Sequence, residues 1–384
     1  MSLIKNLALL VASLILSLYL VEIGITVYQT IAGNDVRTKY QVVNDYKGAA
    51  VPAVFPSMFL DSNLMHGDME VLPLAGIANK TTVYCNESGD YSIYESDRYG
   101  FNNPDYIWDN VIDVALIGDS FVHGACVESE KNIASQLNLI MHKNTKLFNV
   151  LNLGMGGAGP FTELAILKEY AKHAKPKHVF WFFYEGNDMN GLIVEKRSAF
   201  LKKYNNNKYT QDLINKQEVI DKVLSKYISN NTHSVLKKNS RMLRLYNTRK
   251  LLAPFFAHYS SKPVSSYSGK QLNELRGLLN NAKSLVEGWN GKLYFVYLPS
   301  IDRYKEEMVN HVDSLGKNDI INLVKKINIP IIDMHNNFIS SGKDPLDFFP
   351  NRRQMHYNSD GYRKIAKSIN KYLNIANLEQ KNEK

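Results

Sequence analysis

Short apolar runs alternate with longer mixed stretches over most of the chain, which predicts strands alternating with helices. The runs that predict strands are residues 111–117, 147–151, 178–184, 292–298 and 329–334. Strands that alternate with helices are typical of a parallel sheet with helices on both faces. In such sheets ligands bind at the carboxyl ends of the strands, so the polar residues that follow each run are candidates for a functional site.

The N-terminus carries the longest apolar stretch. Residues 7–21 are uncharged, and residues 23–28 continue the stretch past Glu22. Together they amount to about 22 residues, enough to span a bilayer as a helix, while the uncharged part alone has the length of a signal-peptide apolar region. No Ala-x-Ala cleavage site follows, so we favour an uncleaved anchor over a cleaved signal. Only Lys5 and the amino terminus mark the inner side, and Glu22 is expected either to face a partner helix or to reach the outer interface.

Length and composition agree with one large α/β domain behind this stretch. The chain has 384 residues, of which 45% are hydrophobic, and can bury a full core. The expected organisation is 1–30 membrane anchor or signal peptide, 31–110 membrane-proximal segment leading into the core, 111–195 first part of the α/β domain, 196–290 basic insertion or lid, 291–375 second part of the α/β domain, and 376–384 charged tail.

The junction after the first predicted strand is the most informative motif. Residues 111–117 end in Gly118-Asp119-Ser120, and a helix is expected to come next. A serine on this tight turn has its own backbone N–H at a helix N-terminus, where developing negative charge is stabilised. Ser120 is therefore a candidate nucleophile, provided that a base and oxyanion donors exist elsewhere. On its own the triplet is common turn chemistry, so its interpretation depends on the motifs further along the chain.

Three further blocks come later in the chain, in a fixed order. The second run leads into a glycine-rich loop at 154–160, the third ends in Glu185-Gly186-Asn187-Asp188, and His356 precedes a predicted helix at 362–373. With Ser120, this order of Ser, Gly, Asn and His resembles the four blocks of the SGNH (GDSL-type) hydrolase superfamily. The resemblance implies a flavodoxin-like three-layer α/β/α fold and a serine hydrolase that acts on ester bonds.

Carried over to this chain, the resemblance gives each block a role. It implies that Ser120 is the nucleophile, Gly157 a backbone oxyanion donor, Asn187 a side-chain oxyanion donor and His356 the general base. The Ser120 N–H would be a third oxyanion donor, and a serine hydroxyl needs a neighbouring imidazole to take its proton. Alternatives stay open for single residues: Gly157 ends a strand, Asn187 caps the next helix, or His356 is a hydrogen-bonded loop histidine.

The last block departs from the family pattern. The family has an aspartate three residues before the histidine, and this position is Arg353. A guanidinium has only donors and cannot accept the imidazole N–H. We expect Asp347 to orient His356 instead; a backbone carbonyl or a Ser–His dyad is the alternative. Further acidic candidates are Asp344, Asp333 and Asp360.

Arg353 also supports a second functional hypothesis. Loss of the residue that orients the base costs up to about 10⁴ in rate. A catalytically inactive relative, a membrane-anchored glycan-binding or scaffold module on the same fold, therefore stands beside the enzyme.

Residues 84–104 and 123–127 resemble, within the superfamily, the membrane-anchored SGNH proteins of bacteria, which belong with cell-envelope polysaccharide and O-acylation pathways. This branch implies a single-pass protein of the bacterial inner membrane with a periplasmic or extracytoplasmic catalytic domain. It implies acyl esters of envelope glycan or lipid as substrates and a membrane-bound acyl-donor partner if the acyl group is transferred. Esterase and O-acyltransferase share the acyl-enzyme half-reaction, so the motifs leave both open.

The chain has two cysteines, Cys85 and Cys126, too few for a disulfide scaffold. Both lie near the predicted site, and they could pair if the domain is exported to an oxidising compartment; two buried free thiols are the alternative. No Cys/His spacing is typical of zinc, so we predict neither a metal nor a cofactor.

The net charge of +9 is concentrated in one segment. Residues 196–250 carry 14 Lys/Arg against 3 Asp/Glu, so this segment has a net charge of +11 and the rest of the chain −2. Its candidate uses are binding an acidic polysaccharide, binding the anionic membrane surface, and a solvated lid without a partner. We expect no nucleic-acid partner, because neither aromatic interleaving nor a helix-turn-helix pattern accompanies the charge.

Overall fold

The computed structural model describes residues 2–60, 64–142, 148–238, 245–249, 252, 266–305 and 316–382. Its centre is a five-stranded sheet in which all strands are parallel, in the order β10-β9-β8-β6-β7. Read from β7, this is the 2-1-3-4-5 order of flavodoxin-like folds. The predicted α/β class with a parallel central sheet is confirmed. The strands are β6 (Val114–Gly118), β7 (Val150–Gly154), β8 (His178–Tyr184), β9 (Lys292–Leu298) and β10 (Ile331–Asp333).

Three of the five strands differ in their bounds from the prediction. β6 begins at Val114 rather than at 111 and ends at Gly118. β7 begins at Val150 rather than at 147, because its ladder with β6 runs from Val114↔Val150 to Gly118↔Gly154; residue 147 lies outside the described residues. β10 ends at Asp333, because the Asp333 side chain caps a helix, α14 (Met334–Ile339), that begins at the next residue.

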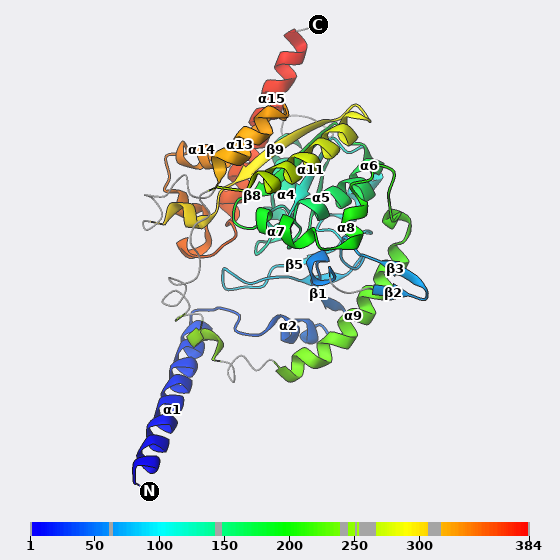
Figure 1. Ribbon diagram of the computed structural model, residues 1–384. Coiled ribbons are helices and arrows are strands. Elements are labelled where there is room, and N and C mark those ends of the chain that lie inside the picture. The colour runs from blue at the N-terminus through cyan, green and yellow to red at the C-terminus, as the bar shows by residue number, and fades with distance from the viewer. Residues whose placement is uncertain are drawn as a thin grey trace.

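Helices cover both faces of the sheet (Figure 1). α5 (Pro160–Ile166), α11 (Gly269–Glu287) and α13 (Lys317–Lys326) contribute to the hydrophobic cluster on one face. α4 (Ile133–His142) and α15 (Ser359–Asn382) contribute to the cluster on the other. These are the three layers that the predicted fold requires.

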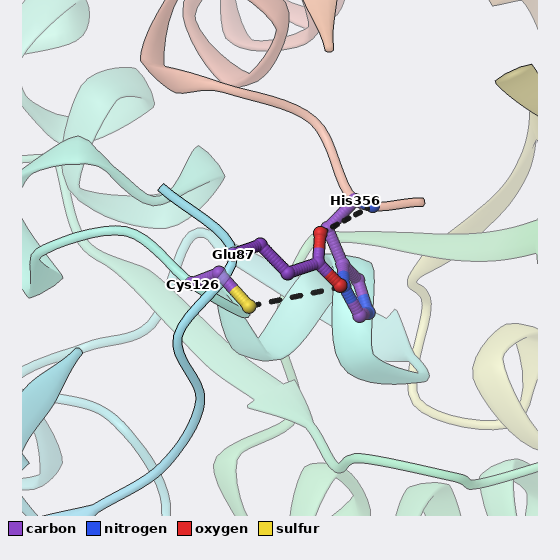
Figure 2. A group of neighbouring side chains, drawn as sticks. All are labelled: Glu87, Cys126 and His356. Carbon is purple, nitrogen blue, oxygen red and sulfur yellow. Dashed lines mark hydrogen bonds and ion pairs between the residues drawn. The ribbon is translucent and has the colours of Figure 1, made fainter. Parts of the chain in front are cut away.

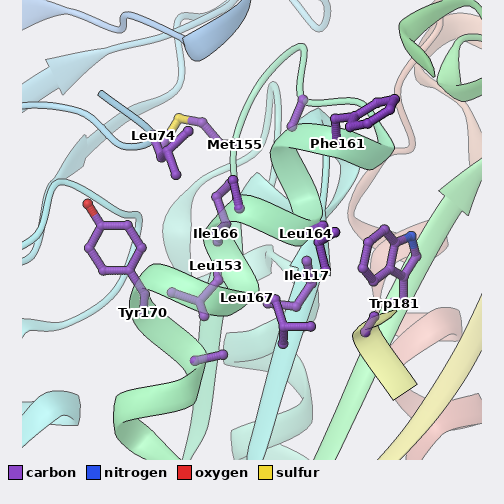
Figure 3. Close-up of a cluster of buried hydrophobic side chains, with 14 of the residues drawn as sticks. Leu74, Ile117, Leu153, Met155, Phe161, Leu164, Ile166, Leu167, Tyr170 and Trp181 are labelled. Carbon is purple, nitrogen blue, oxygen red and sulfur yellow. The ribbon is translucent and has the colours of Figure 1, made fainter. Parts of the chain in front are cut away.

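The strands supply both clusters, because successive side chains of a strand point to opposite faces. Trp181 and Phe183 of β8 belong to the first cluster, whereas Phe180 and Phe182 belong to the second. Figure 3 shows part of the first cluster, where Trp181 and Ile117 lie against Leu164 and its neighbours. The central strands are therefore fully buried, and their carboxyl ends are held rigidly.

The segment between β8 and β9 differs from the predicted insertion at its C-terminal end. α11 buries Leu275, Leu279 and Val286 in the core, so it is the crossover helix that joins β8 to β9. Residues 269–287 therefore belong to the α/β domain rather than to an insertion at 196–290. Among the described residues this segment also contains α7 (Asp188–Glu195), α8 (Ala199–Lys203), α9 (Gln217–Lys238) and a helical turn at 246–249.

Strands within residues 50–95 form a three-stranded sheet and a separate two-stranded sheet. β1 (Ala50–Pro52), β4 (Thr81–Val83) and β5 (Ile93–Glu95) are ordered β1-β4-β5, and β2 (Leu64–His66) pairs with β3 (Met69–Val71) as a hairpin. Leu72 and Leu74, which come just after the hairpin, belong to the main core cluster. This region is thus packed on the α/β domain.

The other elements are short. The helices are α2 (Lys39–Asp45), α3 (Ser120–His123), α6 (Lys172–Ala174) and the π-helical turn Leu167–Ala171. The 3₁₀ turns are η1 (Pro56–Met58), η2 (Asp105–Asp109), η3 (Ser129–Lys131), η5 (Leu213–Asn215), η6 (Ile301–Tyr304), η8 (Pro345–Phe348) and η9 (Pro350–Arg352).

α15 continues to Asn382, so the expected tail at 376–384 has a helical backbone over most of its length.

α1 (Ser2–Ile31) extends away from the domain (Figure 1). Its segment Leu3–Ile31 is long and apolar enough to cross a membrane, and an 18-residue window within it has a mean hydropathy of 2.3. A signal sequence near an N-terminus meets the same criteria, so the anchor stays a prediction.

Glu22 in α1 has partners from a distant part of the chain. Its buried carboxylate accepts hydrogen bonds from the backbone N–H of Asn247 at 3.0 Å and of Thr248 at 2.7 Å, and from the Thr248 hydroxyl at 2.8 Å. Asn247 also donates to the Thr26 hydroxyl at 3.0 Å. The partner of Glu22 is therefore the end of the basic segment, which the sequence did not predict.

A buried ion pair ties the carboxyl end of β8 to η6. Arg303 Nη2 lies 2.6 Å from Glu185 Oε2, and the two side chains are 1% and 0% exposed. The Ser300 N–H and the Tyr297 hydroxyl also donate to Glu185.

Because removing one partner leaves a buried charge unpaired, we expect Arg303→Met to lower the free energy of unfolding by about 3–5 kcal/mol. Urea denaturation measures this loss. Arg352→Met, which removes an exposed arginine bound to Asp344, is the control and should keep the wild-type midpoint. An Arg303→Met protein with an unchanged midpoint would contradict the role given to the pair.

Candidate active site

Ser120 lies on the turn between the central strand β6 and α3. The Asp119 carboxylate accepts the Phe121 N–H at 2.9 Å and so caps α3. Gly118 is required at the end of the strand, because an added Cβ would lie 2.6 Å from the Val122 side chain. The turn therefore holds the Ser120 hydroxyl at the carboxyl end of the sheet, where the strand pattern predicts the site.

His356 reaches Ser120 from the loop before α15. Its Nε2 lies 2.8 Å from Ser120 Oγ, within hydrogen-bond reach of the proton that a general base must take. The imidazole is 8% exposed and packs against Phe121, with the ring centroids 4.9 Å apart. The structure thus brings together the predicted nucleophile and base, which are 236 residues apart.

Glu87 occupies the other side of the imidazole. Its Oε1 lies 2.8 Å from His356 Nδ1, and its Oε2 accepts the His356 backbone N–H at 3.1 Å. Figure 2 shows this carboxylate turned onto the ring. A carboxylate here fixes the tautomer with the proton on Nδ1, so that Nε2 is free to accept the Ser120 proton.

Glu87 replaces Asp347, which the sequence analysis expected at this position. Asp347 is half exposed and binds Arg352, as does Asp344. Arg353, the residue that departs from the family pattern, is exposed to solvent. The expectation of Asp347 is wrong because the motif points to an acid close to His356 in sequence, whereas Glu87 lies 269 residues away.

The other two acidic candidates also have partners away from His356. Asp333 caps α14 and lies 2.7 Å from Lys317 Nζ. Asp360 lies 3.2 Å from Lys343 Nζ. Neither is the partner of either imidazole nitrogen.

Cys85 and Cys126 form a disulfide. It joins the loop between β4 and β5, which carries Glu87, to the chain just after α3. Cys126 Sγ lies 3.9 Å from His356 Nδ1, so the bridge borders the site directly (Figure 2).

Gly157 lies in the loop after β7, which is the neighbour of β6. β7 ends at Gly154, so Gly157 does not simply end the strand. It has a positive φ of 68°, and an added Cβ would meet the Ser57 hydroxyl at 2.5 Å. Such a loop can turn backbone N–H groups toward a substrate, which is the role expected for Gly157.

Asn187 comes after β8, on the other side of β6. It stands at the N-cap position of α7, yet its side chain makes no capping hydrogen bond. Instead, its Nδ2 donates to Asp119 Oδ2 at 3.1 Å. Asp119 thus holds both the turn of Ser120 and the amide of Asn187, the residue expected to donate to an oxyanion.

Two more buried carboxyl groups fix the same loops. Glu195 accepts the backbone N–H of Gly159 at 2.7 Å and of Phe161 at 2.9 Å, which holds the end of the glycine-rich loop. Asp188 accepts the Tyr184 N–H at 2.7 Å. Burial raises the pKa of Glu195 to about 7 and the pKa of Asp188 well above its usual range.

His123 is near Ser120 in sequence but packs away from the hydroxyl. Its ring lies against Tyr84 and Tyr94, with centroids 4.6 and 5.1 Å away. Burial lowers the pKa of His123 to about 3, so the ring is neutral. His356 is therefore the histidine placed to act as the base.

Glu87, Cys126 and His356 are the one group of potential metal ligands found among the described residues, with ligand atoms within 4.8 Å of one another. The Cys126 sulfur is bonded to Cys85, and both imidazole nitrogens already have partners. These donors fit a hydrogen-bonded catalytic group better than a metal site, which needs a thiolate rather than a disulfide sulfur.

Neither the protein-family models nor the curated proteins compared with the chain gave a match. Solved structures with a similar course of the chain include a two-domain esterase active on acetylated mannans (12% identity, TM-score 0.38, covering 68% of this chain and 49% of that one). The chain thus spans about half the length of that esterase. An acetyl xylan esterase (14%, 0.36, 67% and 98%) and an α/β hydrolase enzyme from the metagenome of Lake Arreo, Spain (12%, 0.37, 67% and 92%) are similar to the same degree. Structural similarity with TM-scores this low supports no conclusion about activity.

The position of Glu87 predicts that Glu87→Gln lowers kcat toward an ester by up to about 10⁴-fold, because the amide no longer fixes the imidazole tautomer. Steady-state kinetics with p-nitrophenyl acetate measure the loss. Asp347→Asn is the matched control and should leave kcat unchanged. Equal losses in both variants would show that Glu87 is not the residue that orients His356.

Asn187→Ala should lower kcat by about 10²–10³-fold with little change in KM, because the donor acts on the oxyanion and not on the ground-state ester. Asn190→Ala removes an exposed amide three residues further along α7 and should have no effect. If KM rises and kcat is kept, Asn187 contacts the substrate in another way.

Proposed function

We propose that this chain is a serine esterase or O-acyltransferase of the SGNH type that acts on acyl esters of cell-envelope glycan or lipid. One observation carries the proposal: His356 lies 2.8 Å from Ser120 Oγ through Nε2 and 2.8 Å from Glu87 Oε1 through Nδ1. Nucleophile, base and orienting acid in this order are the arrangement that activates a serine hydroxyl.

In the first half-reaction Ser120 Oγ attacks the ester carbonyl carbon, and His356 Nε2 takes the hydroxyl proton. The negative charge on the carbonyl oxygen would be stabilised by the N–H groups of Ser120 and Gly157 and by the Asn187 amide. The tetrahedral intermediate then collapses to the acyl-enzyme, and His356 returns the proton to the leaving alcohol oxygen.

In the second half-reaction His356 takes a proton from the acceptor, whose oxygen attacks the acyl-enzyme. Water as acceptor gives an esterase and releases a carboxylic acid. A sugar hydroxyl gives an O-acyltransferase, for which a membrane-bound acyl donor would supply the acyl group. Both outcomes restore the Ser120 hydroxyl.

The proposed location is the bacterial inner membrane, with α1 as a single-pass anchor and the catalytic domain on the periplasmic or extracytoplasmic side. The apolar length of α1 supports the anchor. The Cys85–Cys126 disulfide supports an oxidising compartment.

The alternative of an inactive glycan-binding module has lost the feature that favoured it. That feature was Arg353 in place of the family aspartate, and Glu87 provides the carboxylate that this position lacks. We therefore retain the enzyme as the proposed function.

An activated serine probe tests the proposal on the full chain purified in detergent. A fluorophosphonate should label the wild type and not Ser120→Ala, and turnover of p-nitrophenyl acetate should disappear with the label. Ser135→Ala, on α4, is the control and should keep both. If the wild type turns over p-nitrophenyl acetate, acidic oligosaccharides are added next. A faster release of the acyl group from the enzyme in their presence would identify a sugar acceptor. Equal inertness of a folded wild type and Ser120→Ala would overturn the proposal.

A further inference from the structure

The acid of the site belongs to a different sheet from the nucleophile. Ser120 comes directly after β6 of the five-stranded parallel sheet, whereas Glu87 lies between β4 and β5 of the three-stranded sheet. Residues 84–92 have neither helix nor strand structure. The geometry at His356 therefore depends on whatever fixes this loop relative to the parallel sheet, and a misplacement of about 1 Å at a catalytic group can cost about 10² in rate.

Hydrogen bonds order the loop internally and against the residues that come after α1. The Asn86 amide donates to the carbonyl oxygens of Gly89 at 2.9 Å and Asp35 at 3.2 Å, and the Asp35 N–H donates to Gly89. The Ser92 N–H donates to the Cys85 carbonyl at 2.8 Å, which closes the loop at its base. These hydrogen bonds join the loop to residue 35 and close it just before β5, while toward the Ser120 turn the Tyr84 ring packs against His123 of α3.

The disulfide supplies the covalent link to that turn. Cys85 is two residues before Glu87, and Cys126 is six residues after Ser120. Cys126 adopts a positive φ of 60°, in the left-handed region that non-glycine residues seldom adopt, and its Sγ reaches within 3.9 Å of His356 Nδ1. The bridge thus passes beside the atom that Glu87 must reach.

We propose that the Cys85–Cys126 disulfide is a positioning device for catalysis, which keeps Glu87 on His356 and makes the activity depend on an oxidising compartment. The inference rests on the proposed function. On reduction, the S–S bond takes up two electrons and two protons and becomes two thiols; a thiol pool in the cell, or a phosphine oxidised to phosphine oxide in the test, supplies the electrons. The loop then loses its covalent attachment to the Ser120 turn, and Glu87 no longer holds the imidazole.

The chain offers a clean test, because Cys85 and Cys126 are its only cysteines. We would treat the full chain in detergent with a phosphine reductant, verify two free thiols by mass after alkylating a sample, and measure kcat and KM for p-nitrophenyl acetate. We expect kcat to fall at least about tenfold and at most as far as in Glu87→Gln, about 10⁴-fold, with KM unchanged. Reoxidation should restore kcat.

A double-mutant cycle separates positioning from general stabilisation. Reduction should cause no further loss in the Glu87→Gln background, because the effect acts through Glu87. Cys85→Ser/Cys126→Ser should reproduce the reduced wild type, and circular dichroism should show that both remain folded. The same fold-loss in both backgrounds, or an unchanged kcat after complete reduction, would overturn the inference. An oxidised wild type without turnover would instead be a failure of the proposed function.

Discussion

The imidazole of His356 is hydrogen-bonded at both ring nitrogens, and the chemistry of the site depends on keeping both hydrogen bonds. Ser120 and Glu87, the two partners, come from segments that are distant in sequence and belong to different sheets. Serine activation requires Nε2 to be unprotonated, which is a consequence of the carboxylate at Nδ1. The buried central sheet holds the Ser120 end of this arrangement, and the proposed role of the disulfide is to hold the Glu87 end.

Hydrogen bonds stabilise the buried carboxyl groups near the site. Asp119 and Glu195 accept backbone or amide N–H groups of the loops that surround Ser120, so their burial is offset by hydrogen bonds that also order those loops. Burial raises the pKa of Glu163 and of Asp188 well above the usual range.

Much of this arrangement could be predicted from local patterns. The apolar runs gave all five strands of the parallel sheet, and Ser120, Gly157, Asn187 and His356 each stand next to the element that the pattern placed beside them. Glu87 could not be found in this way, because no local pattern links a loop residue to a histidine 269 positions later. One signal was available: Cys85 is two residues from Glu87, and a pairing with Cys126 would have brought that loop to Ser120.

The same reasoning explains the error at 196–290. The charge of the basic segment is easy to see, whereas α11 has an amphipathic pattern, with Leu275, Leu278 and Leu279 on its buried face, that a helix outside the sheet could also show. Their burial depends on which side of β9 the helix crosses, and this is a property of the whole sheet. The predicted insertion therefore extends past the basic segment at 196–250 and wrongly includes α11.

The contact between Glu22 and residues 247–248 fixes where the end of the basic segment lies along α1. With α1 as an anchor, residues 3–21 span about 28 Å, close to the thickness of a hydrocarbon layer. The next turns, from Glu22 to Ile31, rise about 14 Å further and are braced by the end of the basic segment. In that arrangement residues 247–248 would lie at the level of Glu22, at the edge of the hydrocarbon layer, so the end of the basic segment would meet the lipid head groups.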